Sequence, residues 1–229
     1  MLKAVIFDFD GVIADAEPLH YSTFRDALSR HYNVDLPKER YYASYLGYTD
    51  IECARAVSTD FALNLDEAGI YELVHRKTAL FKQLAKTQTT IIPGAAECVH
   101  MLSKNHIPTA ICSGAFLSDI HLMLKNTDLA HSFDIIVAAD HTKKGKPDPQ
   151  GLFLTLDRLN KASKDKILPT QCVFVEDSRW GLQAAKAAQM HRVAVTNTYP
   201  AEELKEFAEK VVNHLSELTI TDLQSLCTD

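Results

Sequence analysis

The hydrophobic pattern begins with a short apolar run that ends in two carboxylates. Residues 4–7 are all apolar, and Asp8, Asp10 and Gly11 come immediately afterwards. An uninterrupted apolar run bounded by a turn signal indicates a strand buried on both faces, as in parallel sheets. Side chains alternate along a strand, so we expect both aspartates on the same side at its carboxyl end. Open α/β sheets bind their ligands at that edge.

The pattern then becomes helical. Residues 16–85 contain no convincing strand, and apolar residues recur at three- and four-residue spacing over 18–30 and over 66–86. Asp66 is the predicted N-cap of the second of these helices. We expect a small helical bundle inserted into the first β-to-α connection, with its second hinge at residues 87–90.

Strands and helices alternate from Pro93-Gly94 onward. The expected strands are 107–112, 135–138, 171–175 and 192–196, with an edge strand at 210–213. The expected helices are 95–104, 117–126, 151–159 and 201–209, and a further helix that Ser178 caps and that continues to residue 188. This alternation predicts an α/β fold with a doubly wound, Rossmann-like parallel sheet. Residues 1–15 and 89–229 form the predicted core, and residues 16–88 form the helical cap.

Composition and charge narrow the classes of partner. The chain has 229 residues, a formal net charge of -6 and a pI near 5.9, which argue against nucleic acid and against anionic membranes. No apolar stretch reaches transmembrane length, and the first strand leaves no room for a signal peptide. Five scattered cysteines suit reduced thiols. We therefore expect a cytoplasmic protein, and a monomer because no long apolar edge or heptad pattern is present.

Polar residues follow several of the predicted strands at the same edge of the sheet. They are Asp8 and Asp10 after the first strand, Ser113 after the second, Lys146 after the third, and Glu176 and Asp177 at the fourth. Carboxylates, a hydroxyl and a lysine that converge on one crevice favour phosphoryl transfer, in which Mg²⁺, an ammonium group and hydrogen-bond donors balance the phosphate charge. Aspartate is a known covalent acceptor of phosphoryl groups.

These residues resemble the four motifs of the haloacid dehalogenase superfamily. The matching segments, in order, are Asp8-Phe9-Asp10-Gly11, Ser113, Lys146-Pro147 and Glu176-Asp177. The helical insert resembles the α-helical cap of the β-phosphoglucomutase-like and phosphoglycolate-phosphatase-like branch. The resemblance covers nearly the whole chain and includes Glu17-Pro18-Leu19-His20 near the start of the insert.

The resemblance implies a role for each matching residue. Asp8 attacks phosphorus to form an aspartyl phosphate, and Asp10 is the general acid and then the general base. Ser113, the Gly114 backbone N–H and Lys146 hold the phosphate. The metal ligands for Mg²⁺ are the Asp8 carboxylate, the Asp10 backbone carbonyl and Asp177. Glu17 and His20 are the expected substrate-binding residues of the cap.

Plainer explanations exist for several of these residues. Asp8 and Asp10 could form a solvated acidic loop, Ser113 could cap a helix, and Lys146 could be a solvated loop lysine. The match of four ordered motifs opposes all three. Two questions stay open. Glu176 is either a metal ligand or the neighbour of one, and His20 could equally be a core or helix-surface residue.

The cap loop bears on the substrate. Mutases of this branch use a lysine and an arginine in that loop to hold a second phosphate, and the matching positions here are Leu46 and Asp50. Compared with the mutases, this loop lacks two cations and carries an additional anion, which disfavours binding of a bisphosphate. We therefore expect a Mg²⁺-dependent phosphatase for a small phosphorylated metabolite such as a sugar phosphate. The alternatives are a β-phosphoglucomutase-type phosphotransferase and, more remotely, a signalling receiver domain.

Overall fold

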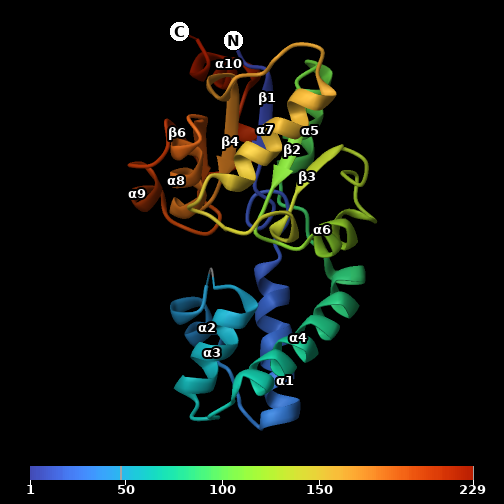
Figure 1. Ribbon diagram of the computed structural model, residues 1–229, viewed down its shortest axis with the longest axis vertical. Coiled ribbons are helices and arrows are strands. Elements are labelled where there is room, and N and C mark those ends of the chain that lie inside the picture. The colour runs from blue at the N-terminus through green and yellow to red at the C-terminus, as the bar shows by residue number, and fades with distance from the viewer. Residues whose placement is uncertain (47, 229) are drawn as a thin grey trace. The chain divides into compact units, whose positions relative to one another are not determined.

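The computed structural model describes residues 1–46 and 48–228, and its sheet confirms the predicted α/β class. The strands are β1 (Ala4–Phe7), β2 (Thr109–Cys112), β3 (Ile135–Val137), β4 (Cys172–Glu176), β5 (His191–Val195) and β6 (Lys210–Val212). All neighbouring strands are parallel, in the order β3-β2-β1-β4-β5-β6 (Figure 1). The order reverses at β1 and β4, and open sheets of this kind bind ligands at such a switch point.

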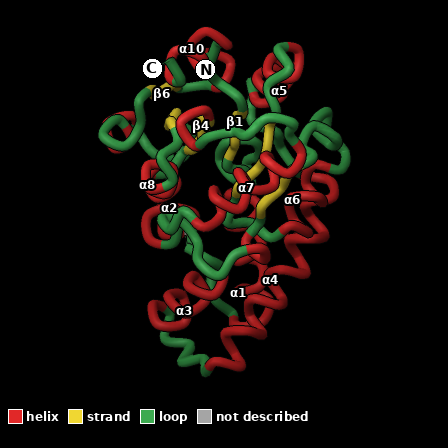
Figure 2. The backbone as a smooth tube through the Cα atoms, turned by 45° about the horizontal axis from the view of Figure 1, so that its top comes forward, coloured by secondary structure: helices red, strands yellow, loops and turns green. Residues whose placement is uncertain are grey.

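Helices cover this sheet in the α/β unit of the chain. They are α5 (Ala95–Lys104), α6 (Leu117–Leu124), α7 (Gln150–Ala162), α8 (Arg179–Ala187), α9 (Ala201–Leu204) and α10 (Ile220–Leu226). Figure 2 shows the strands in yellow with α5, α7 and α8 around them. Alternate residues of the strands, such as Ile6 and Phe174, pack with Leu152 and Leu156 of α7 and with residues of α8 in one core cluster.

The opposite face of the sheet is also buried. Val5, Phe7, Val173 and Val175 point to the side away from that cluster, and each is 0% exposed. Burial on both faces explains why the strands read as continuous apolar runs in the sequence. The strand β1 is therefore fixed from both sides, and the residues that follow it begin from a rigid support.

The chain divides into two compact units. Met1–Asp15 and Thr90–Asp229 form the α/β unit, and Ala16–Thr89 forms a helical unit. The helical unit contains α1 (Glu17–Tyr32), α2 (Lys38–Ser44), α3 (Asp50–Asp60) and α4 (Glu67–Gln88). Its own core includes Phe24, Leu28, Tyr41, Val57 and Leu73. Gly47, in the loop that the sequence analysis assigned to substrate choice, lies outside the described residues.

The two helix N-caps predicted from the sequence are present in the structure. The Asp66 side chain accepts a hydrogen bond from the Gly69 backbone N–H at the start of α4, and the Ser178 side chain accepts one from the Gly181 N–H at the start of α8. Both are N-cap interactions that satisfy otherwise unpaired N–H groups of the first helical turn.

The carboxyl-terminal region differs from the sequence prediction. The helix expected at 201–209 is only the short α9, which ends at Leu204 because the chain turns there to enter β6. The helix α10 was not predicted, although Thr219 and Asp222 form a capping box at its start. That Thr-x-x-Asp spacing was a usable signal. In the described part of the chain, no helix combines the length and apolar character that crossing a membrane requires.

Candidate active site

The turn after β1 brings the first motif to the carboxyl edge of the sheet. Phe7 pairs with Val175 of β4, so Asp8 and Glu176 emerge at the same level from neighbouring strands. Gly11 has a φ of 77°, in the left-handed region that favours glycine. A Cβ at this position would lie 1.8 Å from Asp177 Oδ2, so only glycine fits beside that carboxylate.

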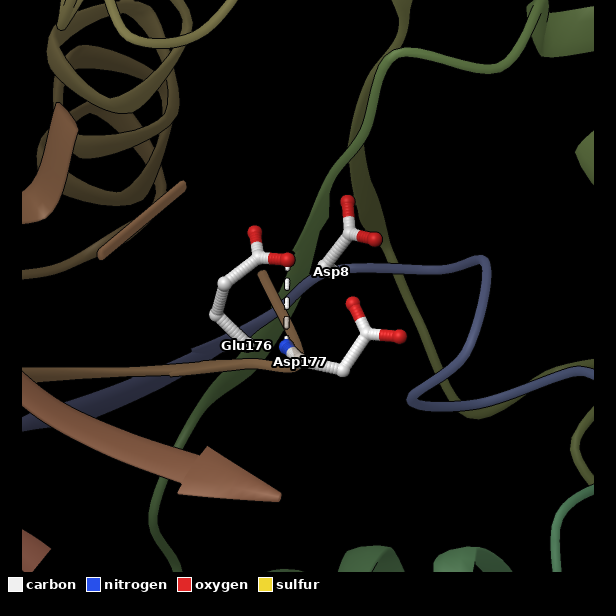
Figure 3. A group of neighbouring side chains, drawn as sticks. All are labelled: Asp8, Glu176 and Asp177. Atoms are coloured by element: carbon white, nitrogen blue, oxygen red, sulfur yellow. Dashed lines mark hydrogen bonds between the residues drawn. The ribbon is translucent and has the colours of Figure 1, made fainter. Parts of the chain in front are cut away.

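Three carboxylates gather at this edge. One oxygen from each of Asp8, Glu176 and Asp177 lies within 4.8 Å of the others (Figure 3). The residues are 6%, 1% and 5% exposed. Buried like charges at this separation are costly unless a cation or a proton compensates them. Oxygen donors in this number are the ligands that Mg²⁺ prefers, so the cluster fits a hard divalent cation.

Lys146 supplies part of the compensating charge. Its Nζ lies 2.5 Å from Asp8 Oδ1 and 2.5 Å from Glu176 Oε2, and it also lies over the Phe174 ring. Burial opposes the charged form, but the carboxylates of Asp8 and Glu176 outweigh it and raise the pKa of Lys146. Lys146 is therefore a permanent ammonium group bound to the site, unlike a solvated loop lysine.

Two of the carboxyl groups, those of Asp8 and Asp177, keep raised pKa values despite this lysine. Burial raises the pKa of Asp8 to about 6, with a further contribution from Glu176, while Lys146 works in the opposite direction. Burial, followed by the charges of Glu176 and Asp8, raises the pKa of Asp177 well above its ordinary value. A single ammonium group thus does not balance the charge of three carboxylates, and a bound cation would supply the positive charge that is still needed.

Glu176 has hydrogen-bond partners on both of its oxygens. Oε1 accepts from the backbone N–H groups of Asp177 at 3.1 Å and Ser178 at 3.0 Å, and Oε2 accepts from Lys146. Helix α8 can approach this closely because residue 181 is glycine, where a Cβ would lie 1.7 Å from Oε2. Glu176 therefore orients Lys146 and the start of α8.

Ser113 lies at the end of β2 and is 8% exposed. Its Oγ accepts a hydrogen bond of 3.1 Å from the Ala115 backbone N–H, and the N-cap of the following helix α6 is Phe116. The hydroxyl thus belongs to the turn after the strand and does not cap α6, and its proton can still be donated. Gly114 is exposed, with open space where a Cβ would be.

The other predicted residues are placed as follows. Asp10 forms a backbone bridge with Ala14 that shapes the turn after β1. Glu17 and His20 belong to α1 of the helical unit, where Glu17 accepts a hydrogen bond of 2.7 Å from the Tyr41 hydroxyl. Cys112 is buried, and burial raises the pKa of its thiol to about 11, so it is an inert thiol.

The helical unit contains a charge cluster that the sequence analysis missed. Lys77 is 1% exposed, and its Nζ donates to Asp50 Oδ1 at 2.7 Å and Oδ2 at 2.9 Å and to His20 Nδ1 at 2.6 Å. The pKa of Asp50 is lowered to about 2, because His20 and the Lys77 charge outweigh the opposing effect of burial. Asp50 is therefore an ionised carboxylate whose charge is balanced by Lys77. This finding corrects the expectation of an uncompensated negative charge at this position.

The signal for Lys77 was present in the apolar stripe of α4. Ile70, Leu73, Phe81 and Ala85 are buried along this helix, and Lys77 lies in the same stripe. A lysine in such a position requires a partner, since buried charges are rarely left unpaired. The ammonium group can only donate, so its two partners are groups that can accept, the Asp50 carboxylate and a ring nitrogen of His20.

Removal of this lysine is expected to destabilise the protein. Lys77→Met should lower the free energy of unfolding by about 2 kcal/mol or more, because Asp50 and His20 lose their charged donor in a mostly buried setting. Denaturant unfolding measures the loss. Lys82→Met, at an exposed lysine of the same helix, is the matched control and should change stability by less than about 0.5 kcal/mol. If Lys77→Met lowers the free energy of unfolding no more than Lys82→Met does, the contacts of Lys77 with Asp50 and His20 add nothing to stability.

The chain matches known proteins over most of its length. The family model for haloacid dehalogenase-like hydrolases matches residues 5–195. The phosphorylated carbohydrates phosphatase of Thermotoga maritima is 30% identical over 84% of this chain and 84% of its own. Fructose-1-phosphate phosphatase YqaB of Escherichia coli is 32% identical over 83% and 95%. A β-phosphoglucomutase structure from Clostridium difficile aligns with a TM-score of 0.82 at 24% identity, covering 99% and 97%, which shows a shared fold.

A parallel sheet with an acid cluster and a lysine at its switch point suits an α/β enzyme that acts on an anionic substrate. The family match makes the assignment specific. This chain belongs to the haloacid dehalogenase-like hydrolase family, as its four motifs indicated.

Proposed function

We propose that this protein is a Mg²⁺-dependent phosphatase that hydrolyses a small phosphorylated carbohydrate through an aspartyl phosphate on Asp8. The observation that carries the proposal is the contact of Asp8 with Lys146 beside two further buried acids at the sheet's switch point. The names of two relatives, a phosphorylated carbohydrates phosphatase and a fructose-1-phosphate phosphatase, support the substrate class.

The Asp8 carboxylate, the Asp10 backbone carbonyl and Asp177 would hold the magnesium ion. We place Glu176 beside these ligands, because both of its oxygens already accept hydrogen bonds from the backbone or from Lys146. When bound, Mg²⁺ neutralises phosphate charge and completes the balance of the carboxylates.

In the first step Asp8 attacks the phosphorus atom of the substrate. A bond forms between Asp8 and phosphorus while the bond to the sugar oxygen breaks, and Asp10 gives its proton to that oxygen. Lys146 has a fixed position beside Asp8, and Ser113 with the Gly114 N–H donates to the phosphate oxygens. These donors are in place before the reaction, so they stabilise the developing charge without reorganisation.

In the second step water attacks the phosphorus of the aspartyl phosphate. Asp10, now ionised, takes the proton of that water, and Asp8 leaves as a carboxylate. Inorganic phosphate is released and both aspartates return to their initial protonation states. The same residue thus acts as acid and then as base, and no further titratable group is required.

The helical unit is proposed to act as the cap that selects the leaving group, with Glu17 and His20 as its substrate-binding residues. A mutase would need cations there that are available for a second phosphate. Within the helical unit, Lys77 is buried and its donors are directed to Asp50 and His20. Lys77 therefore cannot serve as such a cation, and we expect the cap to accept an uncharged sugar moiety in place of a second phosphate.

Assays with β-glucose 1-phosphate and glucose 6-phosphate distinguish a phosphatase from a mutase. We expect Mg²⁺-dependent release of inorganic phosphate from sugar monophosphates and no activation by glucose 1,6-bisphosphate. A phosphate assay and a coupled assay for glucose 6-phosphate, run in parallel, measure the two fates. Interconversion of the two esters faster than phosphate release would replace the phosphatase with the β-phosphoglucomutase-type alternative.

A further inference from the structure

The short segment after β5 contacts two parts of the site. Thr198 Oγ1 donates a hydrogen bond to Asp177 Oδ2, and Asn197 Nδ2 donates one of 2.8 Å to the Gly11 carbonyl oxygen. Gly11 directly follows Asp10, and Asp177 is a proposed ligand. One segment of the chain therefore contacts both of the loops that carry the proposed metal site.

The packing at this point is tight. A Cβ at Gly11 would lie 1.8 Å from Asp177 Oδ2 and 3.0 Å from Thr198 Oγ1. The Asp177 carboxylate is thus held between the backbone of the first motif and the hydroxyl of Thr198. A side chain with a neighbour on each side and a hydrogen bond on one oxygen has little freedom to rotate.

The segment is also anchored on its other side. Thr196 N–H donates to the Val212 carbonyl oxygen at 3.1 Å, and Thr196 Oγ1 donates to Asn213 Oδ1 at 3.2 Å. These contacts tie the segment to the end of β6. Thr198 therefore approaches Asp177 from a support that is fixed to the sheet.

We propose that Thr198 is a positioning residue that sets the affinity of the site for Mg²⁺, an inference that rests on the proposed function. Its hydrogen bond to Oδ2 fixes the carboxylate so that the other oxygen is presented to the cation. Partners that orient a metal ligand in this way typically change metal affinity by about 10- to 100-fold when removed. Thr198 is exposed, so its replacement leaves the core intact.

The test compares three variants of the full chain. Thr198→Val keeps the shape but removes the hydroxyl, Thr198→Ser keeps the hydroxyl, and Thr196→Val removes a hydroxyl of the same segment that bonds to Asn213. Isothermal titration with MgCl₂ alone gives the dissociation constant of each protein. We expect Thr198→Val to weaken Mg²⁺ binding by about tenfold or more. Thr198→Ser and Thr196→Val should stay within about threefold of wild type.

Each result bears on a separate claim. If the wild type binds Mg²⁺ and Thr198→Val binds it equally well, the inference is wrong and the proposed function is unaffected. The inference is also wrong if Thr196→Val weakens binding as much as Thr198→Val, because the effect is then one of segment stability. If the wild type itself binds no Mg²⁺, the proposed function loses its metal and the role of Thr198 is lost with it.

Discussion

Asp8→Asn is expected to give a folded protein with less than about a thousandth of the wild-type turnover, since loss of a covalent nucleophile usually costs more than that. The amide has nearly the shape of the carboxylate, so it can keep the same position beside Lys146. It lacks the charge and the nucleophilic oxygen that form the acyl phosphate. Steady-state phosphate release measures the loss, and circular dichroism with thermal unfolding checks the fold.

A folded Asp8→Asn protein that keeps more than a thousandth of the activity would assign the nucleophile to another residue. Asp148→Asn is a suitable control, because Asp148 is a partly buried carboxylate of the loop that carries Lys146 but has no contact with Asp8 or Glu176 among the described interactions. Its turnover should stay close to that of the wild type.

Asp10→Asn is expected to lose about 10² to 10⁴ in turnover of a sugar phosphate, the range that general acid and base assistance supplies. The variant should still bind Mg²⁺, because the proposed ligand from this residue is the backbone carbonyl. Calorimetry with MgCl₂ tests that division of roles. Complete loss of Mg²⁺ binding in the folded variant would contradict it.

The choice of leaving group separates the role of Asp10 as an acid from its role as a base. The p-nitrophenolate ion leaves without a proton, so the first step with p-nitrophenyl phosphate needs no acid, whereas the second step still needs a base. Asp10→Asn should therefore release one equivalent of p-nitrophenol quickly and then turn over slowly. Stopped-flow absorbance shows the burst. Equal slowing of the burst and of the steady state would indicate that Asp10 also takes part in positioning the phosphate.

Local sequence patterns were sufficient for most of the fold. The apolar run of β1, the cap at Ser178 and the acids after β4 each depend on neighbours a few residues away, and the family motifs have the same local character. The helix α9 is shorter than its periodicity suggested, because the chain must turn to reach β6. Such tertiary requirements override helix propensity.

Contacts between distant segments could not be predicted. Lys77 and Asp50 are 27 residues apart, and Thr198 and Asp177 are 21 residues apart, so no spacing rule connects them. The sequence therefore presented Asp50 as an uncompensated anion in the loop. The proposed position of Glu176 beside the metal ligands rests in the same way on hydrogen bonds to both of its oxygens, which only the folded arrangement shows.

Trapping of the covalent intermediate tests whether Asp8 is the nucleophile. Asp10→Asn protein is mixed with p-nitrophenyl phosphate and Mg²⁺, and the reaction is quenched in acid. The protein is then digested, and the masses of the peptides are measured by mass spectrometry. We expect one added phosphoryl group on the peptide that contains Asp8. This group should be absent in the Asp8→Asn/Asp10→Asn double variant and absent when EDTA replaces Mg²⁺. A burst of p-nitrophenol with the phosphoryl group on another residue, or with none on Asp8, would show that Asp8 is not the nucleophile.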